Sequence, residues 1–130
     1  MVTAAENTKR PVRVLVADDE PDARELLCAQ LRHEGIEIVG VAVDTDEAVR
    51  MARVLSPDVA LLDWMMPGGG GGRATREMQA SSPKVRVVGI SAATGEDPQY
   101  DMLTAGAVGF LRKGCSRPEL AESIRSALRW

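Results

Sequence analysis

Short runs of β-branched and other apolar residues alternate along this chain with longer segments whose apolar residues recur at helical spacing. The runs that predict strands are Val12–Ala17, Ile38–Val43, Val59–Leu62, Val85–Ile90 and Ala107–Leu111. Strands separated by helices pair in parallel, and right-handed crossovers place the helices on both faces of the sheet. Because Val59–Leu62 is apolar at every position, we expect it to be a central strand. The alternation predicts a doubly wound α/β fold of five strands and five helices.

The predicted helices begin and end at residues that suit helix termini. The pairs that form capping boxes are Asp44 with Glu47 and Ser116 with Glu119. The first helix starts at Pro21, which is favoured in a first turn, and ends before Gly35. Its apolar positions at helical spacing are Ala23, Leu26, Leu27 and Leu31.

Five consecutive glycines, Gly68–Gly72, precede the weakest predicted helix, Arg73–Ala80. A glycine run is typical of a flexible connector, so we expect high mobility from Gly68 to Arg73. A phosphate-cradling loop is the alternative, but no Gly-Lys-Ser/Thr follows and the spacing of a dinucleotide-binding loop fails at Arg73. The apolar residues of this helix are only Ala74, Met78 and Ala80.

The composition is that of one globular domain. The chain has 130 residues, of which 45% are hydrophobic and 27% charged, with a net charge of −3. We expect residues 1–10 to form a disordered leader and residues 11–130 to form the domain. No basic excess is available for nucleic-acid or membrane binding, and no apolar run is long enough to span a bilayer.

The cysteines and the single histidine exclude some kinds of site. Cys28, Cys115 and His33 lack the spacing of metal ligands, and one histidine cannot complete a zinc site or a histidine-based triad. We expect both thiols to be free in a reducing cytoplasm.

Polar side chains stand where the predicted strands end. They are Asp18, Asp19 and Glu20 after the first strand, Asp63 after the third, Ser91 after the fourth and Lys113 after the fifth. In an open α/β sheet the binding crevice lies at the carboxyl ends of the strands. Converging carboxylates repel one another, and a few carboxylate oxygens among waters suit Mg²⁺. A lysine and a hydroxyl at the same edge can bind phosphoryl oxygens.

These motifs resemble the receiver domain of bacterial two-component response regulators. The matching stretches are Val14–Pro21, Leu61–Pro67 with Gly71, Ile90–Ala92 and Gly109–Lys113. The resemblance extends from about Pro11 to Leu128. It implies a flavodoxin-like (βα)5 sheet of strand order 2-1-3-4-5 and a signalling domain rather than an enzyme.

The resemblance also implies roles for individual residues. Asp63 would accept a phosphoryl group from a sensor histidine kinase or a phosphotransfer protein, with Mg²⁺ required. The implied metal site consists of Asp19, Asp63 and the Met65 carbonyl as direct ligands, with Asp18 acting through water. Lys113 and Ser91 would contact the phosphoryl oxygens, and Ser91 and Phe110 would form the switch. The face made by the fourth helix, the fifth strand and the fifth helix would then signal to an output domain or a second copy.

The chain departs from the usual receiver pattern in two places. Gly114 follows Lys113 where most receivers have proline, so we expect a trans peptide bond there. Lys113–Ser116 resembles the NarL/FixJ subfamily, whose output is a helix-turn-helix. Gly72 replaces an aliphatic residue, which predicts a weakly anchored third helix.

Two other functions are compatible with an aspartate at a strand end. A phosphatase of the haloacid-dehalogenase type needs a second acid two residues after the nucleophile, where this chain has Met65. A pseudo-receiver, which binds partners without taking phosphate, usually lacks one of the acids, the hydroxyl or the lysine. Phosphorylation with a small phosphodonor distinguishes these functions.

Overall fold

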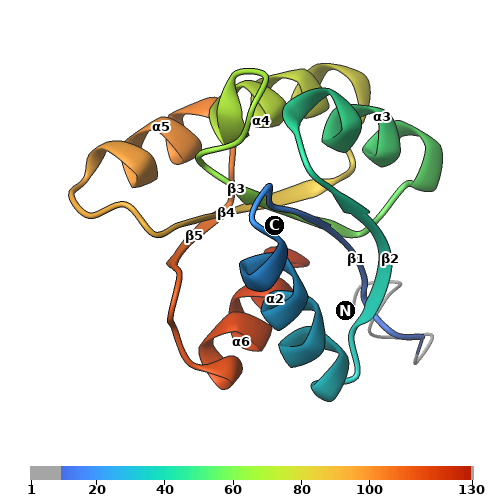
Figure 1. Cartoon of the computed structure of the whole chain (residues 1–130). Coiled ribbons are helices and arrows are strands. Elements are labelled where there is room, and N and C mark those ends of the chain that lie inside the picture. Colours follow the sequence, from blue (N-terminus) through green and yellow to red (C-terminus); the bar gives the residue numbers. More distant parts are fainter. Residues whose placement is uncertain (1–9, 130) are drawn as a thin grey trace.

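A computed structural model describes residues 10–129 and has the predicted α/β architecture (Figure 1). In chain order, the elements are β1 (Arg13–Ala17), α2 (Pro21–His33), β2 (Glu37–Ala42), α3 (Thr45–Leu55), β3 (Val59–Asp63), α4 (Gly70–Ser81), β4 (Arg86–Ser91), α5 (Asp97–Ala105), β5 (Gly109–Arg112) and α6 (Arg117–Ala127). The five strands are parallel in the order β2-β1-β3-β4-β5, which confirms the predicted fold class.

Helices cover both faces of this sheet. Figure 1 shows α3, α4 and α5 on one face and α2 and α6 on the other. Each face has its own hydrophobic core, one containing Leu31 and Ile124 and the other containing Met78 and Met102. Every residue of β3 is buried, as expected for a central strand. No helix in the described range is long and apolar enough to cross a membrane.

The predicted leader lies outside the described residues except for its last residue, Arg10. The Arg10 guanidinium donates two hydrogen bonds of 2.9 Å to the Asp58 carboxylate. The same carboxylate accepts a hydrogen bond from the Arg13 backbone N–H. Arg10 is therefore attached to the start of the sheet.

The capping predictions are largely confirmed. Ser116 and Glu119 form a complete capping box at α6. Asp44 accepts a 2.8 Å hydrogen bond from the Glu47 N–H, but the Glu47 side chain accepts from Val43 rather than from Asp44. The Glu47 side chain thus bonds the backbone of the residue before the N-cap, and the capping box predicted at α3 is only half formed.

Two apolar residues of the predicted helices are exposed. Leu26 is 59% exposed, because the buried stripe of α2 consists of Leu27, Cys28 and Leu31. Ala80 of α4 is exposed too, since it lies two residues from the buried Met78 and so on nearly the opposite side of the helix. In both helices the buried stripe is narrower than the apolar spacing suggests.

The glycine run is largely helical, and the prediction of a flexible connector is wrong for Gly70–Gly72. These glycines form the buried first turn of α4, which starts three residues earlier than predicted. A Cβ on Gly71 would lie 2.6 Å from the Asp63 carbonyl oxygen, and one on Gly72 would lie 2.4 Å from Asp101 Oδ2. The glycines therefore permit a close approach of α4 to β3 and α5.

We expect unequal effects on stability from two neighbouring alanine substitutions in this turn. Gly71→Ala places a methyl group against backbone that cannot move aside, and should lower the free energy of unfolding by about 1–3 kcal/mol. Gly72→Ala meets only the end of the Asp101 side chain, so the better helix propensity of alanine should leave stability unchanged or raised by up to ~1 kcal/mol. Urea unfolding of the two variants measures both values. Equal stabilities would contradict the close packing of Gly71 on β3.

Candidate functional site

The polar residues predicted at the strand ends lie together at the carboxyl edge of the sheet. Asp63 is the last residue of β3 and Ser91 the last of β4, while Asp18 and Lys113 directly follow β1 and β5. The strand order places β3 between β1 and β4, at the point where the chain turns from one half of the sheet to the other. This is the position at which open α/β sheets bind ligands.

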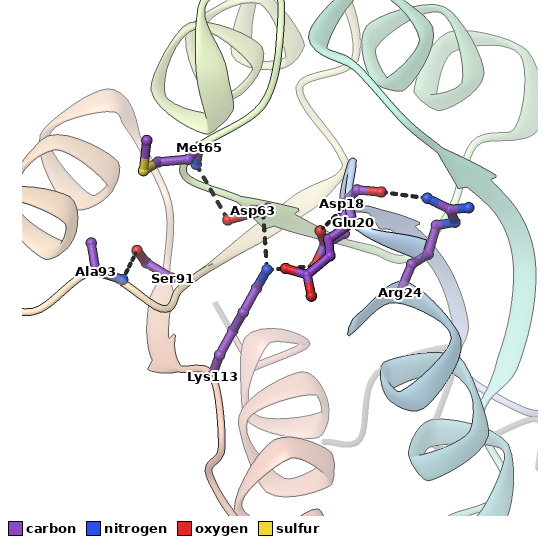
Figure 2. Close-up of polar contacts among 8 residues, drawn as sticks. All are labelled: Asp18, Glu20, Arg24, Asp63, Met65, Ser91, Ala93 and Lys113. Atoms are coloured by element: carbon purple, nitrogen blue, oxygen red, sulfur yellow. Dashed lines mark hydrogen bonds and ion pairs between the residues drawn. The ribbon is translucent and has the colours of Figure 1, made fainter. Parts of the chain in front are cut away.

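Lys113 lies between two buried carboxylates. Its Nζ is 2.8 Å from Asp18 Oδ2 and 3.1 Å from Asp63 Oδ2 (Figure 2). Asp18 is fully buried and Asp63 is 4% exposed. Burial favours the neutral amine, but the two carboxylates outweigh it and raise the pKa of Lys113 above its ordinary value. The lysine side chain thus remains a cation at neutral pH.

The cluster retains an excess of negative charge. Burial and, next, the neighbouring charge of Asp18 raise the pKa of Asp63 to about 6, against the opposing effects of Lys113 and the Met65 N–H. Carboxylate oxygens of Asp18, Asp19 and Asp63 all lie within 4.8 Å of one another. Three carboxylates beside one ammonium fit a hard divalent cation such as Mg²⁺, which binds oxygen ligands and keeps part of its hydration.

Backbone hydrogen bonds hold the two acids in place. Asp18 Oδ1 accepts a 2.9 Å bond from the Glu20 N–H, and the Asp18 carbonyl accepts a 2.8 Å bond from the Arg24 guanidinium. Asp63 Oδ1 accepts a 3.2 Å bond from the Met65 N–H. The role of Arg24 was not predicted, although an arginine one turn into the helix after an acidic strand end is a possible signal.

Ser91 and Phe110 lie next to the loop between β4 and α5. Ser91 is 1% exposed, and its Oγ accepts a 3.0 Å hydrogen bond from the Ala93 N–H. Phe110 is partly buried against the core beneath α5, and the Arg112 guanidinium lies 5.1 Å from its ring centre. Arg112 also donates to the carbonyl groups of Ala93 and Gly95. Arg112 was not predicted to take part in this arrangement.

The Met65 side chain lies away from the acids. It is 64% exposed and extends away from the Asp63 carboxylate in Figure 2. Its backbone belongs to the loop that follows β3.

Other sequence-based expectations about this region and the thiols agree with the structure. No peptide bond among residues 10–129 is cis, so the bond after Lys113 is trans, as predicted. Cys28 and Cys115 are free.

Comparison with known proteins indicates one domain family. The family model of the response regulator receiver domain matches residues 14–125. The chain is 37% identical over 115 residues to the response regulator GacA of Pseudomonas viridiflava, covering 88% of this chain and 54% of GacA. It therefore spans about half the length of this curated relative.

Solved structures show the same fold. The signal receiver domain of NarL from Mycobacterium tuberculosis superposes with a TM-score of 0.88 at 35% identity, covering 92% of this chain and 98% of that one. The receiver domain of sensor histidine kinase PA1611 from Pseudomonas aeruginosa, which has a magnesium ion in its active-site cleft, gives 0.84 at 26% identity, with coverages of 92% and 99%. With the family model, the shared topology and the acidic cluster in agreement, the chain belongs to the response regulator receiver domain family.

Proposed function

We propose that this domain is a phosphoacceptor of two-component signalling in which Asp63 is the nucleophile. A carboxylate oxygen of Asp63 forms the new bond to phosphorus, and the bond from phosphorus to a histidine nitrogen of the kinase or phosphotransfer protein breaks. The observation that carries this proposal is the placement of Lys113 between the buried Asp18 and Asp63. The transfer needs positioning and neutralisation of charge more than covalent chemistry from the protein.

The residues present suit Mg²⁺ as the cofactor. Asp19, Asp63 and the Met65 carbonyl would hold the ion directly, and Asp18 would act through water. The different roles of Asp19 as a direct ligand and Asp18 as a ligand through water are supported by their exposure. Asp19 is exposed, whereas Asp18 is buried and paired with Lys113. When bound, the ion supplies positive charge for the oxygens of the transferring group.

Lys113 and Ser91 would bind the oxygens of the phosphoryl group once it is on Asp63. The Lys113 ammonium already contacts Asp63 Oδ2, and so it can neutralise a phosphoryl oxygen on the same side. Ser91 ends the strand next to β3, with its hydroxyl bonded to the Ala93 N–H. A dianionic phosphoryl group would attract that hydroxyl as a donor.

Movement of Ser91 would transmit the effect of phosphorylation to the surface of the domain. We propose that it creates space for the Phe110 ring, and that the face formed by α5, β5 and α6 then changes its affinity for an output domain or a second copy. Phe110 suits this role because it is partly buried and has no hydroxyl to satisfy when it moves inward.

Phosphorylation of the purified protein tests this function. With phosphoramidate and Mg²⁺, we expect mass spectrometry to find one phosphoryl group, on Asp63, and Asp63→Asn to abolish its uptake. Continuous release of phosphate from many phosphate esters would instead indicate a phosphatase. An intact, folded protein that takes up no phosphoryl group would indicate a pseudo-receiver.

Binding of Mg²⁺ should raise thermal stability. The cluster of Asp18, Asp19 and Asp63 is repulsive when empty, and an ion bound only by the folded state stabilises it by mass action. We expect millimolar Mg²⁺ to raise the midpoint of the wild type by several degrees and to have little effect on Asp19→Ala. Asp22→Ala, which removes an acid of the first turn of α2 outside the cluster, is the matched control. An unchanged wild-type midpoint would contradict the metal site.

The phosphoryl group on Asp63 should be long-lived. In receivers, the side chains at the positions of Met65 and Ala93 flank the approach of the hydrolytic water, and neither residue has a group that orients water strongly. We expect the double variant Met65→Asn/Ala93→Glu to lose its phosphoryl group faster than the wild type, with Met65→Leu as the apolar control. Equal decay rates of the double variant and the wild type would show that these positions do not control water access.

A further inference from the structure

Trp64 connects the loop after Asp63 to three other elements. Its backbone N–H donates a 2.8 Å hydrogen bond to Ile90 of β4, and its carbonyl accepts a 2.9 Å bond from the Gly71 N–H of α4. Its indole Nε1 donates a 2.9 Å bond to Asp101 Oδ2 of α5. The residue that directly follows the candidate nucleophile is thus tied through its side chain to one of the helices proposed to signal.

The absence of a side chain at Gly72 makes this contact possible. A Cβ there would lie 2.4 Å from Asp101 Oδ2, the same oxygen that accepts the indole proton. The other oxygen of Asp101 lies 4.0 Å from Arg76 Nη1. The last glycine of the run therefore leaves the space through which a carboxylate of α5 reaches Trp64.

Trp64 also lies between two residues of the proposed metal site. Asp63 precedes it, and the Met65 N–H that follows it donates to Asp63 Oδ1. We propose that Asp101 is a positioning residue that acts through Trp64 and couples the position of α5 to the loop of Asp63 and Met65. This coupling rests on the proposed Mg²⁺-dependent function, and it is separate from the route through Ser91 and Phe110.

Coupling of this kind is reciprocal. If Asp101 favours the loop geometry that binds Mg²⁺, then Mg²⁺ must favour the position of α5 in which Asp101 contacts Trp64. Loss of the contact should weaken Mg²⁺ binding by a factor on the order of 3–10, the size usual for residues that couple sites without touching the ligand. It should also remove the effect of Mg²⁺ on hydrogen exchange in α5.

Three variants of the full chain separate the hydrogen bond from charge and from stability. Asp101→Leu removes the acceptor, whereas Asp101→Asn removes the charge but keeps an oxygen that accepts from the indole. Gly72→Ala displaces the carboxylate by a methyl group while keeping or improving the stability of α4. Calorimetry with Mg²⁺ alone gives the affinity, and circular dichroism checks folding. A Trp130→Phe background leaves Trp64 as the single tryptophan, so that its fluorescence reports on the loop.

We expect Asp101→Leu and Gly72→Ala to weaken Mg²⁺ binding several-fold and Asp101→Asn to retain nearly wild-type affinity. In a Trp64→Phe background, which lacks the indole donor, Asp101→Leu should have no further effect on the affinity.

Other outcomes overturn the proposal. Wild-type affinity in both Asp101→Leu and Gly72→Ala would show that the contact does not couple the sites, while the proposed function would stand. Equal losses in Asp101→Asn and Asp101→Leu would assign the effect to charge rather than to the hydrogen bond. A wild type that does not bind Mg²⁺ would overturn the coupling and the metal-dependent function together.

Discussion

The structure depends on the burial of two carboxylates side by side with one ammonium between them. Asp18 follows β1 and Asp63 ends the neighbouring strand β3, and Lys113 contacts both at 2.8 and 3.1 Å. Buried like charges are costly, and burial followed by the charge of Asp18 raises the pKa of Asp63 against the opposing effect of Lys113. The fold therefore maintains a site that is poised to bind further positive charge. A divalent metal ion bound there would relieve this repulsion.

The strand order explains why the cation that contacts Asp18 and Asp63 is a lysine. Lys113 follows the edge strand β5, so its side chain must extend past β4 to reach the ends of β3 and β1. A long flexible stem spans that distance, and the Lys113 backbone N–H is fixed by a 2.9 Å hydrogen bond to the Ser91 carbonyl. The residue at the end of β4 is the small, buried Ser91. The positions of lysine, serine and aspartates are consequences of one topology.

Residue patterns predicted the strands, the helix caps and the convergence of the polar residues, because these depend on local periodicity and on the geometry of parallel sheets. They failed at the glycine run, where local propensity favours a flexible loop. A side chain at position 71 would clash with the Asp63 carbonyl, and one at position 72 would clash with the Asp101 carboxylate, so tertiary contacts account for the glycines. Contacts between residues far apart in the sequence leave no periodic pattern in it. The same limit explains why the hydrogen bond from Trp64 to Asp101, 37 residues apart, was not predicted.

The first turn of α4 has a low helix propensity, and its glycines allow close packing on β3 and α5. A glycine within a helix costs roughly 1 kcal/mol relative to alanine, and Gly70–Gly72 are three in succession. The turn therefore depends on its tertiary contacts with β3 and α5 more than an ordinary helix start does. Repulsion among the acids and weak local helix propensity therefore occur together at one corner of the molecule. A ligand that binds at this corner can shift its conformation only by the difference between its binding free energies for the two conformations.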